Sequence, residues 1–342
     1  MSTKPMATPS KTLSVNATLA RAKSHAKKGQ LSKAKELYHN VLAAFPQNQQ
    51  AKKGLKAIPD QVNKKNQSGP PQAQINSLIA LYAQGKIQEA LKTSDVLTKD
   101  YPNESLLYNI SGVCYKALGQ LDAAVSSYER ALAINPNNAI AHNNLGNLLK
   151  ELGQLDAAVS SYERALAINP HNAIAHNNLG NTFNELGQLD AAICSYKQAL
   201  AIKPDYAEVY YDLANTLEKL GKREAAVSNY EKLLAIKPDY AEAYSSRAWA
   251  HYYSSGNSKA IEDFSRAISL DPKNPEYYYW RGFPYAHMRK WNKAIEDYNQ
   301  AIKLKPDLAG AYYNRGIANK VLGNNAKAKA DMNKGRELGF QD

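Results

Sequence analysis

The stretch AIAHNNLGNLLKELGQLDAAVSSYERALAINPHN, residues 139–172, decides the fold. Its apolar side chains recur three and four residues apart in two segments, which is the spacing of one face of a helix. Gly153 separates the two segments, and Pro170 follows the second. Glycine suits the end of a helix and proline cannot continue one, so the stretch predicts two helices joined by a short turn.

The same unit occurs eight times along the chain. Prolines recur every 34 residues from Pro102 to Pro306, in step with the helical pattern. We therefore predict eight helix-turn-helix repeats over residues 71–342, each with a first helix A and a second helix B. The repeats begin at residues 71, 105, 139, 173, 207, 241, 275 and 309, and positions are counted from these residues.

Side-chain size explains why such repeats should stack. Positions 8 and 20 are small, as in Gly146 and Ala158, so the two helices can approach closely. Positions 4 and 24 are large, as in Tyr210 and Tyr230, and should fill the space between repeats. No repeat can bury this face alone, so we expect one all-α stack stabilised by contacts between neighbours. Pro284 lies inside an expected helix A and predicts a kink or break near Trp280–Pro284.

The motif of residues 139–172 resembles the tetratricopeptide repeat (TPR) family. Leu145, Gly146, Ala158 and Tyr162 stand at positions that define that repeat, and His142 stands where tryptophan is usual. The resemblance implies a right-handed α-solenoid, a superhelix whose A helices line a concave groove. It also implies a protein-binding scaffold without catalytic activity. The repeats are most similar to the TPR region of O-linked N-acetylglucosamine transferases and to bacterial TPR-containing transferases.

The N-terminal segment differs in composition from the repeats. Residues 1–69 carry 13 Lys/Arg and 2 Asp/Glu, a balance of +11 within a chain of net charge +12. We expect residues 1–14 to be disordered, residues 15–46 to form a degenerate repeat, and residues 47–70 to form a short basic helix and linker. Such a segment could bind nucleic acid or an anionic membrane, although its lysines are spread and few aromatic residues accompany them.

Asparagines crowd one face of the A helices. Asparagine is a poor residue for the interior of a helix, so packing does not explain their number. The predicted groove asparagines are Asn109, Asn143, Asn144, Asn147, Asn177, Asn178, Asn181 and Asn215. Their amides can pair with the backbone of an extended peptide. In the transferases that this region resembles, an asparagine ladder at position 6 holds peptide backbone, and the matching residues are Asn144, Asn178 and Asn314.

Beyond residue 206 the same face becomes aromatic and acidic. The predicted contact residues there are Tyr211, Asp212, Trp249, Tyr279, Trp280, Tyr313 and Asn314, with Tyr252, Tyr253 and Phe283 nearby. Exposed aromatic residues often dominate binding energy. Glu208, Asp212, Glu218, Glu242 and Glu276 accompany them, so the partner segment should offer apolar or basic side chains there.

Catalytic and metal-binding motifs are absent from the sequence. No phosphate-binding loop, nucleophile elbow or zinc-binding histidine motif occurs, so we expect no enzyme activity, no cofactor, no metal site and no small-molecule substrate. Cys114 and Cys194 are expected to be reduced thiols. The N-terminus lacks an apolar signal region, and no apolar run is long enough to span a bilayer, which predicts a cytoplasmic protein.

Three functions remain open at this point. The leading hypothesis is a scaffold or adaptor whose groove binds an extended or helical peptide segment of another protein, with self-association as a further possibility. The second assigns binding of nucleic acid or an anionic membrane to residues 1–69. The third is a substrate-recruiting partner of a glycosyl- or sulfotransferase, because similar repeats precede such domains.

Overall fold

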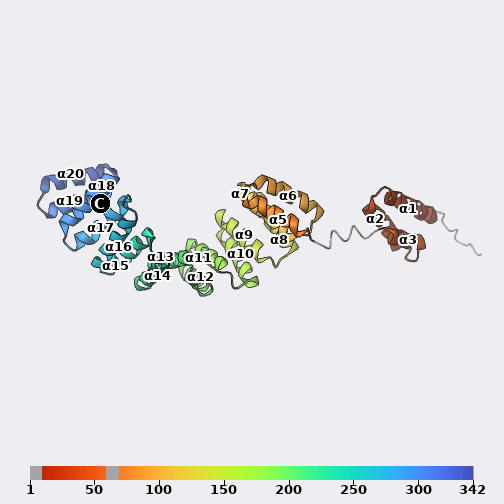
Figure 1. The fold of residues 1–342 in the computed structure, drawn as a ribbon, viewed down its shortest axis with the longest axis horizontal. Helices are drawn as coiled ribbons and strands as arrows, with labels where there is room; N and C mark the ends of the chain where they lie inside the picture. The colour runs from red at the N-terminus through yellow and green to blue at the C-terminus, as the bar shows by residue number, and fades with distance from the viewer. Residues whose placement is uncertain (1–9, 59–68, 342) are drawn as a thin grey trace, which may run out of the picture. The chain divides into compact units, whose positions relative to one another are not determined.

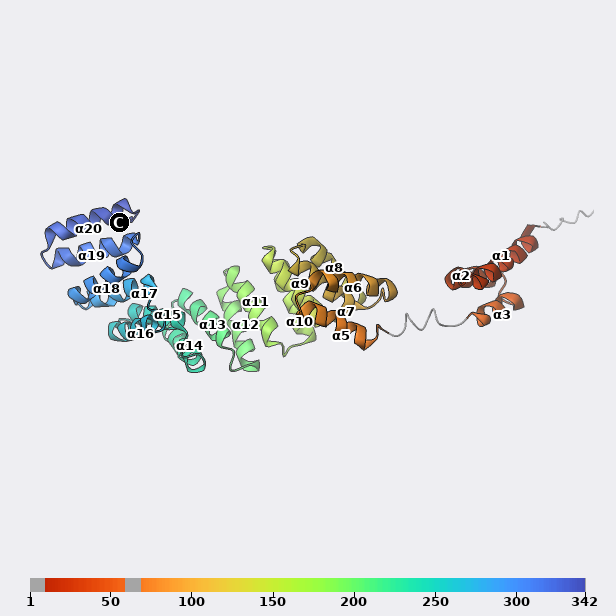
Figure 2. The same cartoon turned by 45° about the horizontal axis from the view of Figure 1, so that its top comes forward.

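The computed structural model describes residues 10–58 and 69–341 (Figures 1 and 2). Within these residues it contains nineteen α-helices and no strand. The chain is an all-α solenoid, as the sequence predicts. The first three helices are α1 (Ser10–Lys27), α2 (Leu31–Ala44) and α3 (Gln49–Ala57).

The N-terminal expectations are met in part. The predicted disorder is wrong for residues 10–14, which form the first turns of α1. Leu19 and Ala22, in later turns of α1, are buried and hold the helix in place. Extending a helix that has already formed costs little free energy, so residues 10–14 can join it. Residues 1–9 lie outside the described residues. The short helix expected after residue 46 is α3, and most of the linker, residues 59–68, also lies outside them.

The remaining helices alternate between A and B. The A helices are α5 (Gln72–Ala83), α7 (Ser105–Ala117), α9 (Ala139–Glu151), α11 (Ala173–Glu185), α13 (Ala207–Lys219), α15 (Ala241–Tyr253), α17 (Pro275–His287) and α19 (Ala309–Val321). The B helices are α6 (Ile87–Asp100), α8 (Leu121–Ile134), α10 (Leu155–Ile168), α12 (Leu189–Ile202), α14 (Arg223–Ile236), α16 (Asn257–Leu270), α18 (Trp291–Leu304) and α20 (Asn325–Glu337).

The chain divides into two compact units. Unit 1 comprises residues Met1–Pro136 and unit 2 comprises Asn137–Asp342. The division falls between the second and third repeats predicted from the sequence. In unit 2 each A helix packs on its own B helix, and each B helix packs on the next A helix. Unit 2 contains most of the predicted groove residues.

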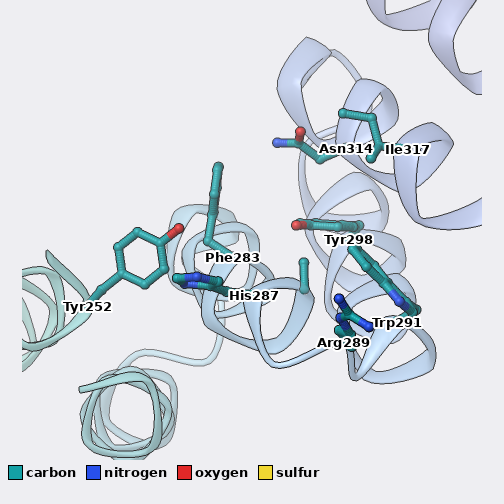
Figure 3. Close-up of a pocket in the computed structure, with 9 residues that line it drawn as sticks. Tyr252, Phe283, His287, Arg289, Trp291, Tyr298, Asn314 and Ile317 are labelled. Atoms are coloured by element: carbon teal, nitrogen blue, oxygen red, sulfur yellow. The ribbon is translucent and has the colours of Figure 1, made fainter. Parts of the chain in front are cut away.

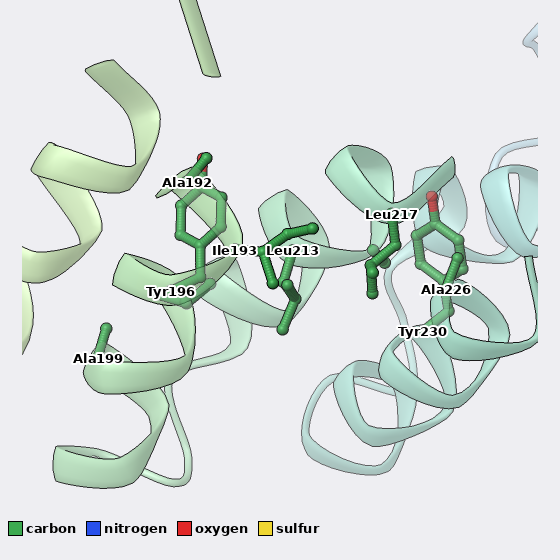
Figure 4. Packing of buried hydrophobic residues seen from close by; sticks show 10 residues of the cluster. Ala192, Ile193, Tyr196, Ala199, Leu213, Leu217, Ala226 and Tyr230 are labelled. Carbon is green, nitrogen blue, oxygen red and sulfur yellow. The ribbon is translucent and has the colours of Figure 1, made fainter. Parts of the chain in front are cut away.

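The core of unit 2 has the side-chain pattern expected from the repeats. In one cluster Ala192 and Tyr196 of α12 pack with Leu213 and Leu217 of α13, and the cluster continues to Tyr230 of α14 (Figure 4). The ring of Tyr196 also explains the small residue at position 8. A Cβ added to Gly180 would come within 2.6 Å of that ring, well inside contact distance.

The turn between helices A and B keeps its geometry even where glycine is missing. Six of the eight predicted repeats have a glycine with positive φ at this turn. In the other two the same backbone conformation is adopted by Ser255, with φ of 61°, and by Arg289, with φ of 57°. Residues with a side chain rarely adopt this conformation because the Cβ atom is crowded.

Of the kink or break predicted near Trp280–Pro284, the break does not occur. Helix α17 continues through Pro284 to His287, and the Met288 N–H donates to the Pro284 carbonyl at 3.0 Å. Proline removes only its own N–H donor from the ladder. Since Pro284 is buried and α17 packs on both α16 and α18, tertiary contacts hold the helix together across the missing bond.

Candidate functional site on the A-helix face of unit 2

The A-helix face of unit 2 is the side of α9, α11, α13, α15, α17 and α19 that carries positions 2, 5, 6, 9, 12 and 13. The asparagines at position 9 have a structural role there. Each accepts a hydrogen bond from the buried tyrosine at position 24 of its own repeat. The pairs are Tyr162–Asn147, Tyr196–Asn181 and Tyr230–Asn215, with O···O distances of 2.7, 2.6 and 2.6 Å.

These contacts correct the interpretation that packing does not require Asn147, Asn181 and Asn215. A buried hydroxyl without a partner is costly, and the amide at position 9 supplies that partner. Asn147 also accepts a hydrogen bond from Nδ2 of Asn178 in the next repeat, at 2.9 Å. That bond uses one of the two N–H donors of the Asn178 amide and leaves the other N–H and the Oδ1 atom for further partners.

The asparagines at position 5 are more deeply set than the sequence suggests. Asn177 is buried, Asn143 is half-buried, and the Oδ1 atoms of both have no hydrogen-bond partner. Asn144 is half-buried and engaged in contacts of its own. Asn109 is buried in α7 of unit 1, so it is described apart from the others.

The acidic residues of the face are partly neutralised within the molecule. Glu208 forms an ion pair with Lys237, and Glu276 lies 3.9 Å from Lys305. Burial raises the pKa of Asp212 to about 6, against the opposing effect of Lys150. Fewer free carboxylates therefore face a basic partner than the sequence predicts.

An aromatic cluster joins α15 to α17. We define it as Trp249, Tyr252, Tyr253, Trp280 and Phe283. The ring of Trp249 is its centre, with centroids 5.5 Å from Tyr252 and Tyr253, 5.7 Å from Phe283 and 6.0 Å from Trp280. Tyr253 remains 59% exposed. The cluster is therefore held by its own contacts and still offers a ring to solvent.

The remaining predicted aromatic residues are engaged in other contacts. Tyr211 packs against Tyr240, with centroids 5.4 Å apart. The Tyr279 hydroxyl accepts a hydrogen bond from Asn314 Nδ2 at 3.1 Å. Tyr313 stacks on Phe340 at 4.3 Å, a contact from the end of the chain that the sequence analysis missed.

A cavity of about 400 Å³ adjoins the aromatic cluster (Figure 3). Its walls come from α15, α17, α18 and α19 and from the turn between α17 and α18. The side chains that give it chemical character are Tyr252, Phe283, His287, Arg289, Tyr298 and Asn314. Of these, Asn314 was a predicted contact residue, and Tyr252 and Phe283 were predicted aromatic residues of the same face. Arg289 and Tyr298 were missed because each stands where the repeat pattern expects a structural residue, whereas His287 stands at position 13 of the face and was not singled out.

Other kinds of site find no support in the described residues. No group of three or more His, Cys, Asp or Glu side chains could hold a metal ion in residues 10–58 and 69–341. In the same ranges no helix combines the length and apolar character needed to cross a membrane. Both cysteines are free thiols, with Cys114 buried and Cys194 exposed.

Family models and solved structures agree on the repeat. A model described as "TPR repeat" matches residues 112–153, 146–187, 180–221, 250–288 and 289–323, and one described as "Tetratricopeptide repeat" matches residues 207–240. The first model alone covers more than half of the chain. No curated protein sequence matches.

Several solved structures have a similar fold. The C-terminal part of a TPR repeat-containing protein from Cytophaga hutchinsonii is 21% identical, with a TM-score of 0.59 over 68% of this chain and 95% of that one. A tetratricopeptide repeat protein from Parabacteroides merdae is 22% identical, with a TM-score of 0.53 over 70% and 94%. YrrB, described as "a TPR protein with an unusual peptide-binding site", is 24% identical, with a TM-score of 0.50 over 55% and 96%. With its repeat spacing, helix pairing and family matches, the chain belongs to the tetratricopeptide repeat family.

Proposed function

We propose that this protein is a non-enzymatic scaffold that binds an extended segment of another protein along the A-helix face of unit 2. Proteins of this family generally mediate protein–protein interactions, and within unit 2 the described helices pack mainly on their neighbours along the stack. The observation that carries the proposal is the aromatic cluster. It places five large rings on this face, next to a cavity.

Packing accounts for only part of the aromatic cluster: Trp249, Tyr252 and Trp280 pack on the core around Phe264, whereas Tyr253 remains exposed. In the three preceding repeats position 9 is an asparagine that serves the buried tyrosine. Positions 12 and 13 of those repeats carry Lys150, Glu185 and other polar residues, whereas α15 has Tyr252 and Tyr253. Rings that are partly exposed and held in place by neighbouring rings bury area on binding with little loss of conformational entropy.

The asparagine region supports an extended rather than a helical segment. The Oδ1 atoms of Asn143 and Asn177 lie 34 residues apart in sequence, at equivalent points of neighbouring A helices, and lack donors. A small rotation of either amide would present it to the backbone N–H groups of a bound peptide. The similarity to the transferase ladder is part of this proposal, with Asn144, Asn178 and Asn314 as its members.

Peptide display on the full-length protein tests the proposal. We expect enrichment of peptides with apolar or aromatic residues, and Tyr253→Ala should weaken their binding at least about tenfold, as for a residue at the centre of an interface. Ile236→Ala is the matched control, because Ile236 is an exposed apolar residue of the same unit on helix B. Absence of enrichment, or equal losses in the two variants, would contradict the proposal.

A further inference from the structure

The hydroxyl of Tyr298 breaks the pattern of its repeat family. In α9, α11 and α13 an asparagine at position 9 accepts the hydrogen bond of the tyrosine at position 24. In α17 that position is Phe283, which has no acceptor. Tyr298 is 2% exposed, and its hydroxyl makes no hydrogen bond among the described residues.

This hydroxyl points into the cavity. Figure 3 shows the Tyr298 oxygen directed away from its own helix, toward the space bounded by Phe283, His287 and Asn314. The Tyr298 hydroxyl has no protein partner among the described residues and opens onto this space, so a ligand in the cavity would be placed to accept its hydrogen bond. The same exchange occurs in unit 1, where Val113 stands at position 9 and Tyr128 at position 24. The missing asparagine alone therefore does not define a site.

Arg289 is the second observation, and it has no counterpart in unit 1. Arg289 lines the cavity and stands at the turn position where Gly119 occurs in the repeat of Tyr128. Its φ of 57° is a conformation that favours glycine. Its backbone N–H donates to the Ala286 carbonyl at 2.9 Å, but its exposed guanidinium forms no ion pair or hydrogen bond in the part of the chain that the structure describes. The repeat thus carries a strained, unpaired cation at a site where glycine would suit the fold better.

The lining of the cavity determines what it can accept. Arg289 contributes a fixed positive charge, Tyr298 contributes an O–H donor, and no Asp or Glu lies among the lining residues. Phe283, Trp291 and Ile317 make the rest of the wall apolar. An anion with a short apolar stem fits these properties, whereas a cation would meet Arg289 with no carboxylate to offset it.

We propose that this cavity binds the carboxylate of an aspartate or glutamate side chain of the partner segment, with Arg289 and Tyr298 as its donors. The inference rests on the proposed function, since the acidic residue belongs to a segment lying along the A-helix face. The partner segment would carry a negative charge at this cavity, whereas the acidic residues of the sequence predict basic partner side chains.

The first test uses peptides that bind the full-length protein. Each acidic residue of a bound peptide is replaced by its amide, Glu→Gln or Asp→Asn. At one position the replacement should weaken binding at least about tenfold, as expected for a charge-assisted hydrogen bond. Arg289→Gly should remove this difference. Lys290→Ala should keep it, because Lys290 carries the same charge one residue away and does not line the cavity.

The second test does not depend on peptide binding. Ligand-observed NMR compares 3-phenylpropionate with 3-phenylpropionamide on the full-length protein. We expect the carboxylate to bind at least about tenfold more tightly, with that preference lost in Arg289→Gly and the affinity reduced about fivefold in Tyr298→Phe. A carboxylate preference without any peptide binding would contradict the proposed function but would still support a carboxylate site at Arg289 and Tyr298. Equal binding of the two probes, or a preference that survives Arg289→Gly, would overturn the inference even if peptides bind.

Discussion

Two tyrosines at the same repeat position differ by one hydrogen bond. The hydroxyl of Tyr196 donates to Asn181 at 2.6 Å, whereas the Tyr298 hydroxyl faces the cavity. The sequence analysis treated every groove asparagine alike, because composition does not show which amide is already engaged. Comparing positions 9 and 24 across repeats would have revealed the pairing, since asparagine and tyrosine occur there together in three successive repeats.

Removing the two hydroxyls should therefore have different effects on stability. Tyr196→Phe leaves Asn181 without its buried donor and should destabilise the protein by about 1 kcal/mol. Tyr298→Phe removes no internal hydrogen bond and should change the free energy of unfolding by less than about 0.5 kcal/mol. Urea unfolding followed by circular dichroism measures both. Equal shifts of the midpoint would show that the pairing with asparagine contributes nothing.

Asp212 predicts a dependence of stability on pH. Its pKa in the folded protein is about 6 because of burial, while an exposed aspartate titrates near 3.9. Between these values the folded state binds more protons than the unfolded state, so this group makes stability fall as pH rises from about 4 to about 6.

Asp212→Asn removes this penalty. The variant should be more stable than the wild type by about 1–3 kcal/mol at pH 7.5 and nearly equal to it at pH 4. Thermal unfolding at the two pH values measures the difference. Glu163→Gln, at an exposed position of α10, is the control and should show no such dependence. A variant that is less stable at pH 7.5 would mean that the charged carboxylate is favourably bound.

At the scale of the helix, the last three repeats use an ion pair where the three preceding repeats use leucine. Arg247, Arg281 and Arg315 stand at position 7 and bind the aspartate at position 23 of the same repeat through both carboxylate oxygens. Leu145 stands at position 7 of the repeat from which the pattern is taken, so that pattern favours an apolar residue there. The spacing of 16 residues between arginine and aspartate, seen three times, was the signal that could have identified the pairs.

Breaking one of these pairs should be costly. Asp297 is 5% exposed, so Asp297→Ala would leave Arg281 without its buried counter-charge and should destabilise the protein by about 3 kcal/mol. The double variant Arg281→Met with Asp297→Leu should recover much of that loss, because no unpaired charge remains. Chemical denaturation of the three proteins checks this. If Asp297→Ala had the same free energy of unfolding as the wild type, solvent would already screen the charges of Arg281 and Asp297.

The turns between helices provide a matched pair of glycine substitutions. Ser255→Gly and Arg289→Gly each remove the steric strain of a Cβ atom at positive φ. Each should stabilise the protein by about 0.5–1 kcal/mol. Ser255 does not line the cavity, so only Arg289→Gly should lose the preference for carboxylates. Thermal unfolding together with the probe titration separates these effects. A destabilised Arg289→Gly protein would mean that the side chain supports the turn rather than a ligand.

At the scale of the whole molecule, the sequence predicts the stack better than the site. The 34-residue period and the alternation of small and large residues specify helices α5–α20, because each helix needs only its neighbours. Helix α17 shows the limit of local rules, since its packing overrides Pro284. The cavity was not predictable, because its shape depends on ring orientations in α15 and α17 and on Arg289 in a turn. The division at Pro136 had no clear signal in the repeat pattern.

Mapping the contact surface tests the central claim most directly. A peptide selected on the full-length protein, carrying a photoreactive benzophenone, is cross-linked to it, and the modified residues are identified by mass spectrometry. We expect cross-links on the A-helix face, concentrated on α15, α17 and α19 around the aromatic cluster. Cross-links confined to the B helices, to unit 1 or to the basic N-terminal segment would contradict the proposed function.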